Sequence, residues 1–337
     1  MCLADRLHSR WVLLAYSHRW RDWRDAGGAV ERLRMVDLAD PQPRRREQQR
    51  PDGRFVRSAD RLHRCRRLLP DLRAVTLALV ERWDGTSWSI QPTPNPAGTT
   101  ESLLTGVSFA APTACTAVAV CFPTYGAVTL AMVERWDGAS WSIQLTPNPT
   151  GETFIGLAGV SCPSPTACTA VGNSPGGTML AEHWNGRRWS IQLTPNPTYS
   201  SLLNDVSCVS TTACTAVGAY SGGALVERWN GRRWSIQRTP NPAGGTNVSL
   251  NGVSCASSTA CTAVAHYNNR AGRELTLVER WDGTSWSIQR TPNPVRASKS
   301  GLTGVSCASP TVCTAVGSYT FASGVQMTLV ERWEGTS

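Results

Sequence analysis

The sequence has 337 residues and a formal net charge of +9. The charge is uneven, because residues 1–75 hold 18 arginines against 10 acidic residues, whereas residues 76–337 hold 15 basic and 14 acidic residues. A nucleic-acid-binding domain needs its positive charge clustered on the folded part of the chain, so this distribution argues against a nucleic-acid partner.

The first 75 residues lack the repeat that fills the rest of the chain and contain no apolar stretch suited to a signal peptide. Read one base later, the codons of Val36–Arg44 permit the end of a repeat, and those of Asp52–Ala74 permit the 22-residue string found at Thr105–Gly126. We therefore predict that residues 33–74 are an out-of-frame translation of a further repeat, within an irregular segment 1–75. A natural basic extension is the alternative.

From residue 76 onward, the motif LVERWDGTSWSIQ recurs with small changes. Successive copies of its first tryptophan are separated by 53, 48, 45, 52 and 52 residues. A fixed period of this length indicates one supersecondary unit per repeat. The six tryptophans are Trp83, Trp136, Trp184, Trp229, Trp281 and Trp333.

Each unit contains four short runs rich in Val, Thr, Ile and Trp, as Ser249–Pro294 illustrates. The runs SLNGVSC, CTAVA, LTLVERW and WSIQRT are separated by Gly, Pro, Asn and Ser, which is typical of strands and turns. We name these strands A to D. Four strands in about 50 residues predict an all-β fold, a β-propeller of four-stranded blades over residues 76–337, with about five to six blades and the last one incomplete.

Two connections are fixed in length and two vary. The A/B cysteine positions are always six residues apart and the C/D tryptophans always five, whereas the B/C and D/A connections change from unit to unit. In an up-and-down blade, the B/C and D/A loops share one end. We call this the variable end, and we expect a ligand to bind there.

The cysteines of the repeats form four CxxxxxC pairs, each flanking an A/B turn. Facing residues of a hairpin come within disulfide reach, so we predict four local disulfides and a secreted protein. Zinc ligation and free thiols are the alternatives. In the first complete unit, Phe109 replaces the A-strand cysteine and leaves Cys115 without that partner. The predicted pairs are Cys162–Cys168, Cys208–Cys214, Cys255–Cys261 and Cys307–Cys313.

The turns WDGTSW, WDGASW and WNGRRW resemble the Asp-box (BNR) turn of sialidase-type propellers, and the whole unit with GVSC, CTAVG, ERWNG and PNP is similar to uncharacterised secreted repeat proteins of GC-rich bacteria. The second resemblance covers about residues 76–337. In the Asp-box family the turn is a fold element remote from the active site, so the resemblance implies no catalysis at Asp84, Asp137 or Asp282. The serine of the box is absent.

No catalytic group, metal cluster or cofactor motif stands out in the repeats. A sialidase resemblance would imply converging arginines and a tyrosine nucleophile, but the ERW glutamate and arginine recur in nearly every unit. Such recurrence indicates a structural role, and we expect the pair to alternate across the strand as a polar ladder. The histidine His183 fills one ERW arginine position.

The candidate ligand-binding residues lie in the B/C and D/A loops. An aromatic platform with nearby polar groups would suit a sugar or a peptide. Three of the tyrosines fall six residues after the B-strand cysteine, which favours a role in blade packing instead. The candidates are Tyr125, Tyr199, Tyr220, His266, Tyr267, Arg270 and Tyr319.

Three functions fit the sequence. The first is a secreted, non-catalytic binding or scaffolding propeller, extracellular or on the cell surface, with carbohydrate or protein as partner, no cofactor and no membrane span. The second is a divergent sialidase-like glycoside hydrolase. The third is an inactive fragment of a larger repeat protein. The ligand, the native blade number and the oligomeric state are not encoded in a recognisable motif.

Overall fold

The computed structural model describes residues 11–13, 77–84, 86–123, 129–147, 149, 155–174, 178–198 and 200–335. These residues form strands and turns, and none of them is helical. The predicted out-of-frame segment 33–74 lies outside the described residues and stays a prediction.

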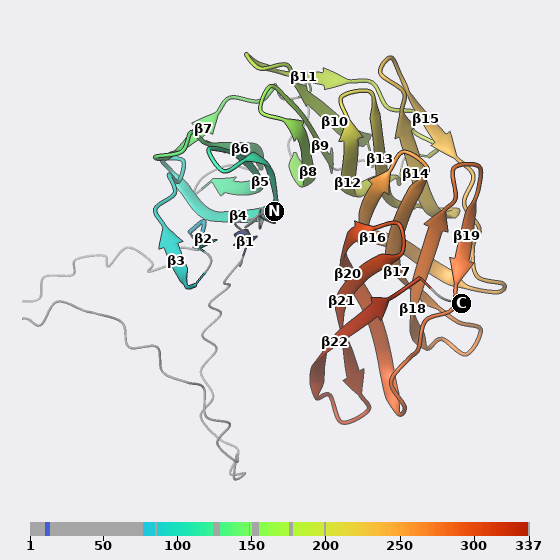
Figure 1. The fold of residues 1–337 in the computed structure, drawn as a ribbon. Helices are drawn as coiled ribbons and strands as arrows, with labels where there is room; N and C mark the ends of the chain where they lie inside the picture. Colours follow the sequence, from blue (N-terminus) through green and yellow to red (C-terminus); the bar gives the residue numbers. More distant parts are fainter. Residues whose placement is uncertain are drawn as a thin grey trace, which may run out of the picture. The chain divides into compact units, whose positions relative to one another are not determined.

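The described strands form five hydrogen-bonded sheets, and the seven-stranded one holds the last two repeats (Figure 1). We describe its two halves as the fifth and sixth sheets, so that each sheet corresponds to one repeat. The first consists of β1 (Trp11–Leu13), β2 (Val80–Trp83) and β3 (Trp88–Gln91). The second sheet contains β4 (Thr99–Ala111), β5 (Ala114–Pro123), β6 (Leu130–Trp136) and β7 (Trp141–Gln144). The third contains β8 (Gly156–Ser164), β9 (Ala167–Ser174), β10 (Thr178–Trp184) and β11 (Trp189–Gln192). The fourth contains β12 (Leu202–Ser210), β13 (Ala213–Tyr220), β14 (Gly223–Trp229) and β15 (Trp234–Gln237).

The fifth sheet contains β16 (Thr246–Ser257), β17 (Ala260–Asn268), β18 (Glu274–Trp281) and β19 (Trp286–Gln289), and the sixth contains β20 (Ala297–Ser309), β21 (Val312–Phe321) and β22 (Gln326–Trp333). One parallel pair, Glu274 with Lys299, joins these two sheets. Five C/D hairpins are complete and the sixth repeat has no D strand among the described residues, as the sequence predicted.

One short element departs from the predicted irregular segment 1–75. The strand β1 pairs antiparallel with β2, with Trp11 opposite Arg82. It occupies the side of the ERW strand that the B strand takes in the later sheets. The reason is that an ERW strand without a B strand leaves an unpaired edge, which any extended segment can cover.

The inner sheets are apolar on both faces because each packs between two others. Along the fourth sheet, Val217 and Val226 belong to a buried cluster with Leu250 of the fifth sheet. The alternate residues Ala216 and Leu225 belong to a cluster with Val171 and Ala181 of the third sheet. We call these the forward and backward faces of a sheet. The period of two along a strand sends successive side chains to opposite faces, so strands buried on both sides need apolar residues at nearly every position.

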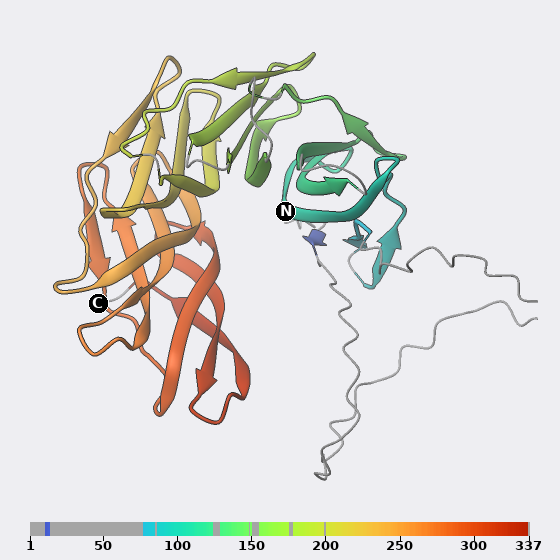
Figure 2. The same cartoon turned by 180° about the vertical axis from the view of Figure 1, so that it is seen from behind.

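The first strands of neighbouring sheets contact one another, in the order β4, β8, β12, β16 and β20. Figure 2 shows the sheets from behind, where they again lie side by side in chain order. Four-stranded antiparallel sheets of one repeat, packed face to face with their first strands adjacent, define a β-propeller. The predicted fold class is confirmed.

Candidate functional site

The D/N-G turns between the third and fourth strands are held by their own side chains. Asp282 Oδ1 accepts hydrogen bonds from the backbone N–H groups of Thr284 and Ser285, at 2.7 and 2.8 Å. These bonds lower the pKa of Asp282 to about 2. The glycine that follows, Gly283, has a φ of 100°, which only glycine adopts without strain. The repeated aspartates and asparagines are therefore turn formers, fully explained by local structure.

The ERW arginines connect each sheet to the next one. Arg228 lies over the indole ring of Trp281, 4.7 Å from its centroid, and donates a hydrogen bond to the backbone oxygen of Ser258. Arg135 makes the same two contacts with Trp184 and Pro165. A guanidinium stacked on an indole while bonded to a carbonyl gains both cation–π attraction and hydrogen bonding. The arginines therefore hold neighbouring sheets together, and we call the contact zone between two sheets a junction.

His183 breaks this series. It stands where the other repeats have arginine, and it is followed in the next sheet by Trp229. Trp229 is only half-buried, whereas Trp184 and Trp281 are each 7% exposed. Burial lowers the pKa of His183, so its ring is held mainly neutral and supplies no cation for Trp229.

The ERW glutamates do not pair with these arginines. Glu134, Glu182 and Glu227 are 0% exposed, and neither carboxyl oxygen of the three has a hydrogen-bond partner among the described residues. Burial raises the pKa of each to about 8. Glu279 differs in that its carboxyl contacts the hydroxyl of Thr239 in the preceding repeat. Glutamate and arginine do alternate across the strand, as expected, but the polar ladder is wrong, because Glu134, Glu182 and Glu227 face an apolar interior without a polar partner among the described residues.

Small polar side chains complete the junctions. In the second to fifth sheets, the A-strand serine accepts a hydrogen bond from the backbone N–H of the next A-strand cysteine, as Ser207 does from Cys255 at 3.0 Å. The threonine of CTAV lies against the next B-strand cysteine, as in Thr215 to Cys261 at 3.7 Å. Most residues that recur in every repeat make contacts between neighbouring sheets.

Four disulfides close the A/B hairpins at the predicted pairs, with Cα–Cα distances of 3.9 to 4.0 Å. In the fourth sheet, Cys208, Cys214, Trp229 and Trp234 stand opposite one another in a single row across the four strands. Cys115 lies opposite Phe109, as the sequence indicated, and is a buried free thiol. Burial raises its pKa to about 12, which makes the thiolate inaccessible at neutral pH.

The described ligand candidates do not all lie in one site, although Tyr267 and Arg270 both lie beside the turn that holds Gly244 and Gly245. Tyr125 and Tyr199 lie outside the described residues. Tyr220 and Tyr267 are partly buried against the clusters of the third/fourth and fourth/fifth junctions, respectively. These positions agree with the packing alternative.

The remaining candidates lie near the fifth and sixth sheets. The His266 ring nitrogen Nδ1 is 3.1 Å from Asn251 Nδ2, which also donates to the backbone oxygen of Leu302. Tyr319 packs edge-on against Phe321, with ring centroids 5.3 Å apart. Arg270 is exposed on the turn after β17. The Arg270 side chain lies against Gly244, so each described candidate has a structural neighbour.

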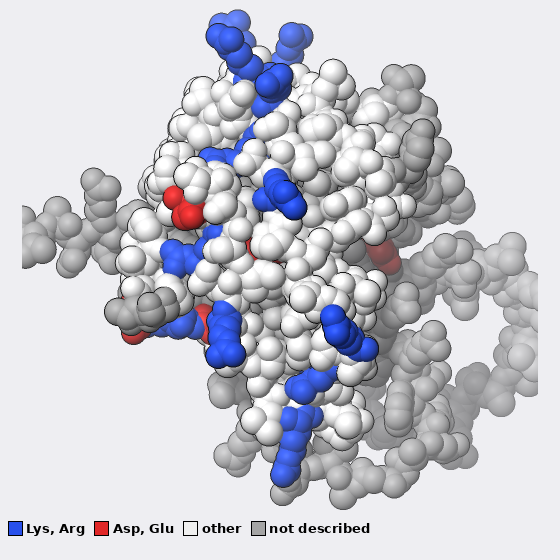
Figure 3. Space-filling model, turned by 90° about the vertical axis from the view of Figure 1, so that its right-hand side faces the viewer, with Lys and Arg blue, Asp and Glu red and all other residues white. Residues whose placement is uncertain are grey.

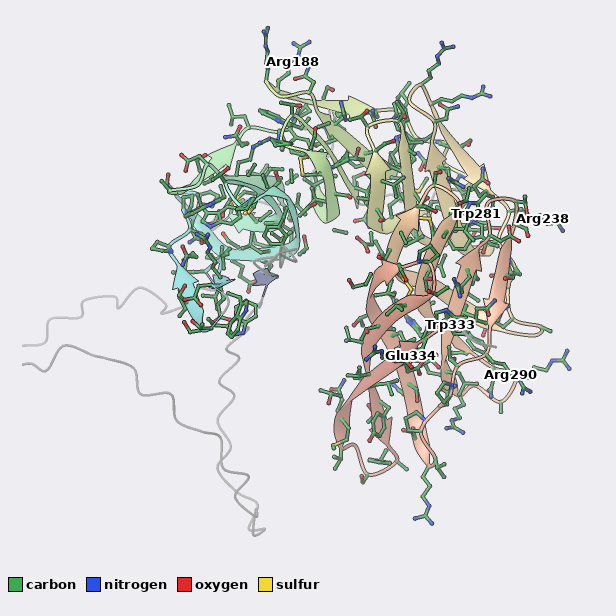
Figure 4. The ribbon with its side chains drawn as sticks, viewed as in Figure 1. Arg188, Arg238, Trp281, Arg290, Trp333 and Glu334 are labelled. Atoms are coloured by element: carbon green, nitrogen blue, oxygen red, sulfur yellow. A yellow bond between two sulfur atoms is a disulfide. The ribbon has the colours of Figure 1, made fainter. Side chains whose placement is uncertain are left out.

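A groove that the sequence did not predict, although it contains the candidate Tyr220, lies along the outer strands of the fourth and fifth sheets. It has a volume of about 740 Å³. Tyr220 and Arg238 line it together with the Trp281–Trp286 pair, whose rings are 5.9 Å apart. Figure 4 shows Arg238 projecting outward from the ribbon on the side where Trp281 lies. The sequence signal was weak, because arginine before TPNP occurs in only two repeats, at Arg238 and Arg290.

The surface of the repeat domain is more basic than its formal charge. Fourteen acidic residues balance fifteen basic ones over residues 76–337, yet four of the glutamates are fully buried with raised pKa values. Figure 3 shows Lys and Arg side chains spread over one face with few acidic groups among them. Burial of these glutamates therefore leaves the surface more positive than the near-neutral count over residues 76–337 indicates. The exposed arginines include Arg187, Arg188, Arg232, Arg233, Arg238 and Arg290.

Two further features concern the described part of the chain. It holds no group of three or more His, Cys, Asp or Glu side chains that could bind a metal ion. Among the described residues, no helix is long and apolar enough to cross a membrane.

Comparison with known proteins identifies the fold class and no more. The chain is similar to a protein of unknown function from Dyadobacter fermentans, with 12% identity, 78% of this chain and 85% of that chain covered, and a TM-score of 0.52. It is also similar to the SapL1 lectin (11% identity, 78% and 90% covered, TM-score 0.49) and to the six-bladed β-propeller lectin of Aleuria aurantia (13% identity, 79% and 90% covered, TM-score 0.46). At these values the two lectins do not bear on what this chain binds.

No protein-family model matches the sequence, and no curated protein matches it. The class that the fold defines is a β-propeller repeat protein with disulfide-closed hairpins.

Proposed function

We propose that this chain is a secreted, non-catalytic binding propeller whose ligand is a carbohydrate or a protein. The observation that carries the proposal is the groove of about 740 Å³ lined by Tyr220, Arg238 and Trp286. Indole and phenol rings beside a guanidinium and hydroxyl groups offer the apolar faces and hydrogen-bond donors that sugars and polar peptides use.

The non-catalytic part rests on how the repeated acidic side chains are used. The turn aspartates accept backbone hydrogen bonds, and four of the six ERW glutamates, Glu134, Glu182, Glu227 and Glu279, are buried between sheets. Neither set is available as an acid and base pair facing solvent. Hairpin disulfides suit an oxidising compartment, which supports secretion.

The proposal is tested by screening the purified chain against immobilised glycans and then measuring the affinity of any hit by calorimetry. Arg238→Ala should weaken binding at least about fivefold, because it removes a charged donor from the groove. Arg232→Ala is the matched control, since Arg232 is an exposed arginine of the same sheet outside the groove.

Equal affinities for the two variants would refute the groove as the site. The loop candidates Arg270, His266, Tyr267 and Tyr319 would then be tested next, beginning with Arg270→Ala. Turnover of aryl glycosides by the wild-type chain, abolished by one acidic substitution, would refute the non-catalytic assignment.

A further inference from the structure

The C/D turns of the third and fourth sheets differ in charge from those of the other repeats. Both read Trp-Asn-Gly-Arg-Arg-Trp, whereas the turns of the first, second and fifth sheets have aspartate before the glycine and small residues after it. The formal charge of such a turn changes from −1 to +2. Two neighbouring sheets therefore carry the same local excess of positive charge.

The asparagines keep the shape of the turn without supplying a negative charge. Asn230 Oδ1 accepts hydrogen bonds from the backbone N–H groups of Arg232 and Arg233, both at 3.0 Å. Asn185 Oδ1 accepts the equivalent two bonds in the third sheet. The aspartates of the other turns accept the same bonds, so the fold itself does not require this change of charge.

No ion pair with a described acidic residue compensates the turn arginines, all four of which are exposed. Residues 156–242 contain six arginines and only three acidic residues. Of these acids, Glu182 and Glu227 are 0% exposed, and Asp205 accepts hydrogen bonds from two backbone N–H groups. The four turn arginines are Arg187, Arg188, Arg232 and Arg233.

The two turns lie at the same end of neighbouring sheets. Gly186 and Gly231 of the C/D turns lie against Thr166 and Thr212 of the A/B turns, so both kinds of turn form the end opposite the variable end. Figure 4 shows Arg188 pointing away from the ribbon at the turn of the third sheet.

An incompletely covered indole lies beside these arginines. Trp229 begins the turn of the fourth sheet and is half-buried, because His183 stands where other junctions place an arginine over the ring. Its Nε1 already donates to the backbone oxygen of Thr211, at 3.3 Å, so the part left for a ligand is the ring. A hollow of about 370 Å³ beside it is also lined by Asn230 and Ser235. An indole next to amide and hydroxyl groups suits stacking on a sugar ring.

We propose that the four turn arginines and Trp229, which we call the arginine surface, bind an anionic polysaccharide. The guanidinium groups contact its sulfate or carboxylate groups, and the indole packs against a sugar ring. Hairpin disulfides favour a polysaccharide over nucleic acid, because they suit an oxidising compartment. The arginine surface shares no residue with the groove of the proposed function.

The test measures binding of a fluorescent heparin dodecasaccharide to the full chain by anisotropy, at about 150 mM salt. We expect saturable binding that weakens steeply as salt is added. Replacing Arg187 and Arg188 together by Ala should weaken binding at least about tenfold and reduce the salt dependence. The matched control replaces Arg290 and Lys299 together by Ala. It also removes two exposed positive charges, from the fifth and sixth sheets, and should change the affinity less than about twofold.

His183→Arg tests the indole without removing it. The new guanidinium should cover Trp229, so heparin should bind several-fold more weakly although the chain gains a positive charge. Poly(vinyl sulfate), which has no sugar ring, should not bind more weakly to this variant. Circular dichroism establishes that each variant is folded.

Three results overturn the proposal. They are absence of heparin binding to the folded wild-type chain, equal losses in the two double variants, and tighter binding of a (dT)20 oligonucleotide than of heparin. Stronger heparin binding by His183→Arg overturns the role of Trp229. Arg232→Ala should weaken heparin binding and leave a groove ligand bound, since Arg232 lies outside the groove, so the failure of one site is distinguishable from the failure of the other.

Discussion

The buried glutamates make the stability of the protein fall as the pH rises, and Glu227→Gln tests this directly. The carboxyl of Glu227 is 0% exposed, and burial raises its pKa from 4.5 to about 8. Between these two values the folded chain keeps the proton that the unfolded chain releases. The stabilisation is therefore complete below about pH 4.5 and is lost as the pH rises toward 8.

The magnitude follows from the two pKa values. One pKa unit corresponds to about 1.4 kcal/mol, so raising the pH from 5 to 8 should lower the free energy of unfolding by about 3 kcal/mol for this residue. Glutamine has the shape of the protonated acid and does not titrate. We expect Glu227→Gln to match the wild type at pH 5 and to exceed it by about 3 kcal/mol at pH 8.

The assay is urea denaturation of both proteins at pH 5, 6.5 and 8, under oxidising conditions that keep the disulfides intact. Glu334→Gln is the control, because Glu334 is 65% exposed and pairs with the 64% exposed Arg332 on the surface. It should show no comparable pH-dependent difference. If the difference between Glu227→Gln and the wild type is the same at all three pH values, Glu227 is not held neutral and the reasoning fails.

Three further predictions concern the repeats. His183→Arg should raise the free energy of unfolding by roughly 0.5 to 1 kcal/mol, because it restores a cation over Trp229. Calorimetry measures this change, and Arg135→His, the reverse substitution, should lower the free energy of unfolding. A decrease for His183→Arg or an increase for Arg135→His would contradict the prediction. Replacing Cys208 and Cys214 together by Ala should lower the free energy of unfolding by roughly 2 kcal/mol. Mass spectrometry after digestion without reductant should find each cysteine pair linked within its own hairpin, and links between sheets would contradict the predicted pairing. Reading the DNA one base later through codons 33–74 should spell the missing repeat, and codons that fail to do so would end the idea of an out-of-frame segment.

Much of the fold was encoded locally and could be predicted. The Asp-Gly and Asn-Gly turns, the fixed spacing of six residues between paired cysteines and the alternation within GVSC and LVERW are short-range features. Each is decided by the backbone and side chains of a single hairpin, as Asp282 and Cys208–Cys214 illustrate. The repeat period then required that equal units pack against one another. For these reasons the strands, the disulfides and the propeller class followed from the sequence.

The tertiary structure decided which face each residue occupies and what it meets there. The sequence places Glu227 and Arg228 side by side, but the period of two sends them to different junctions, one into an apolar interior and the other onto Trp281. The alternation was expected, but the glutamate meets no polar partner among the described residues, so no polar ladder forms and burial raises its pKa. The groove at Tyr220 and Arg238 likewise arises only where two repeats meet. Such contacts join residues some fifty positions apart, so they depend on how two repeats pack and cannot be derived from the sequence of one repeat.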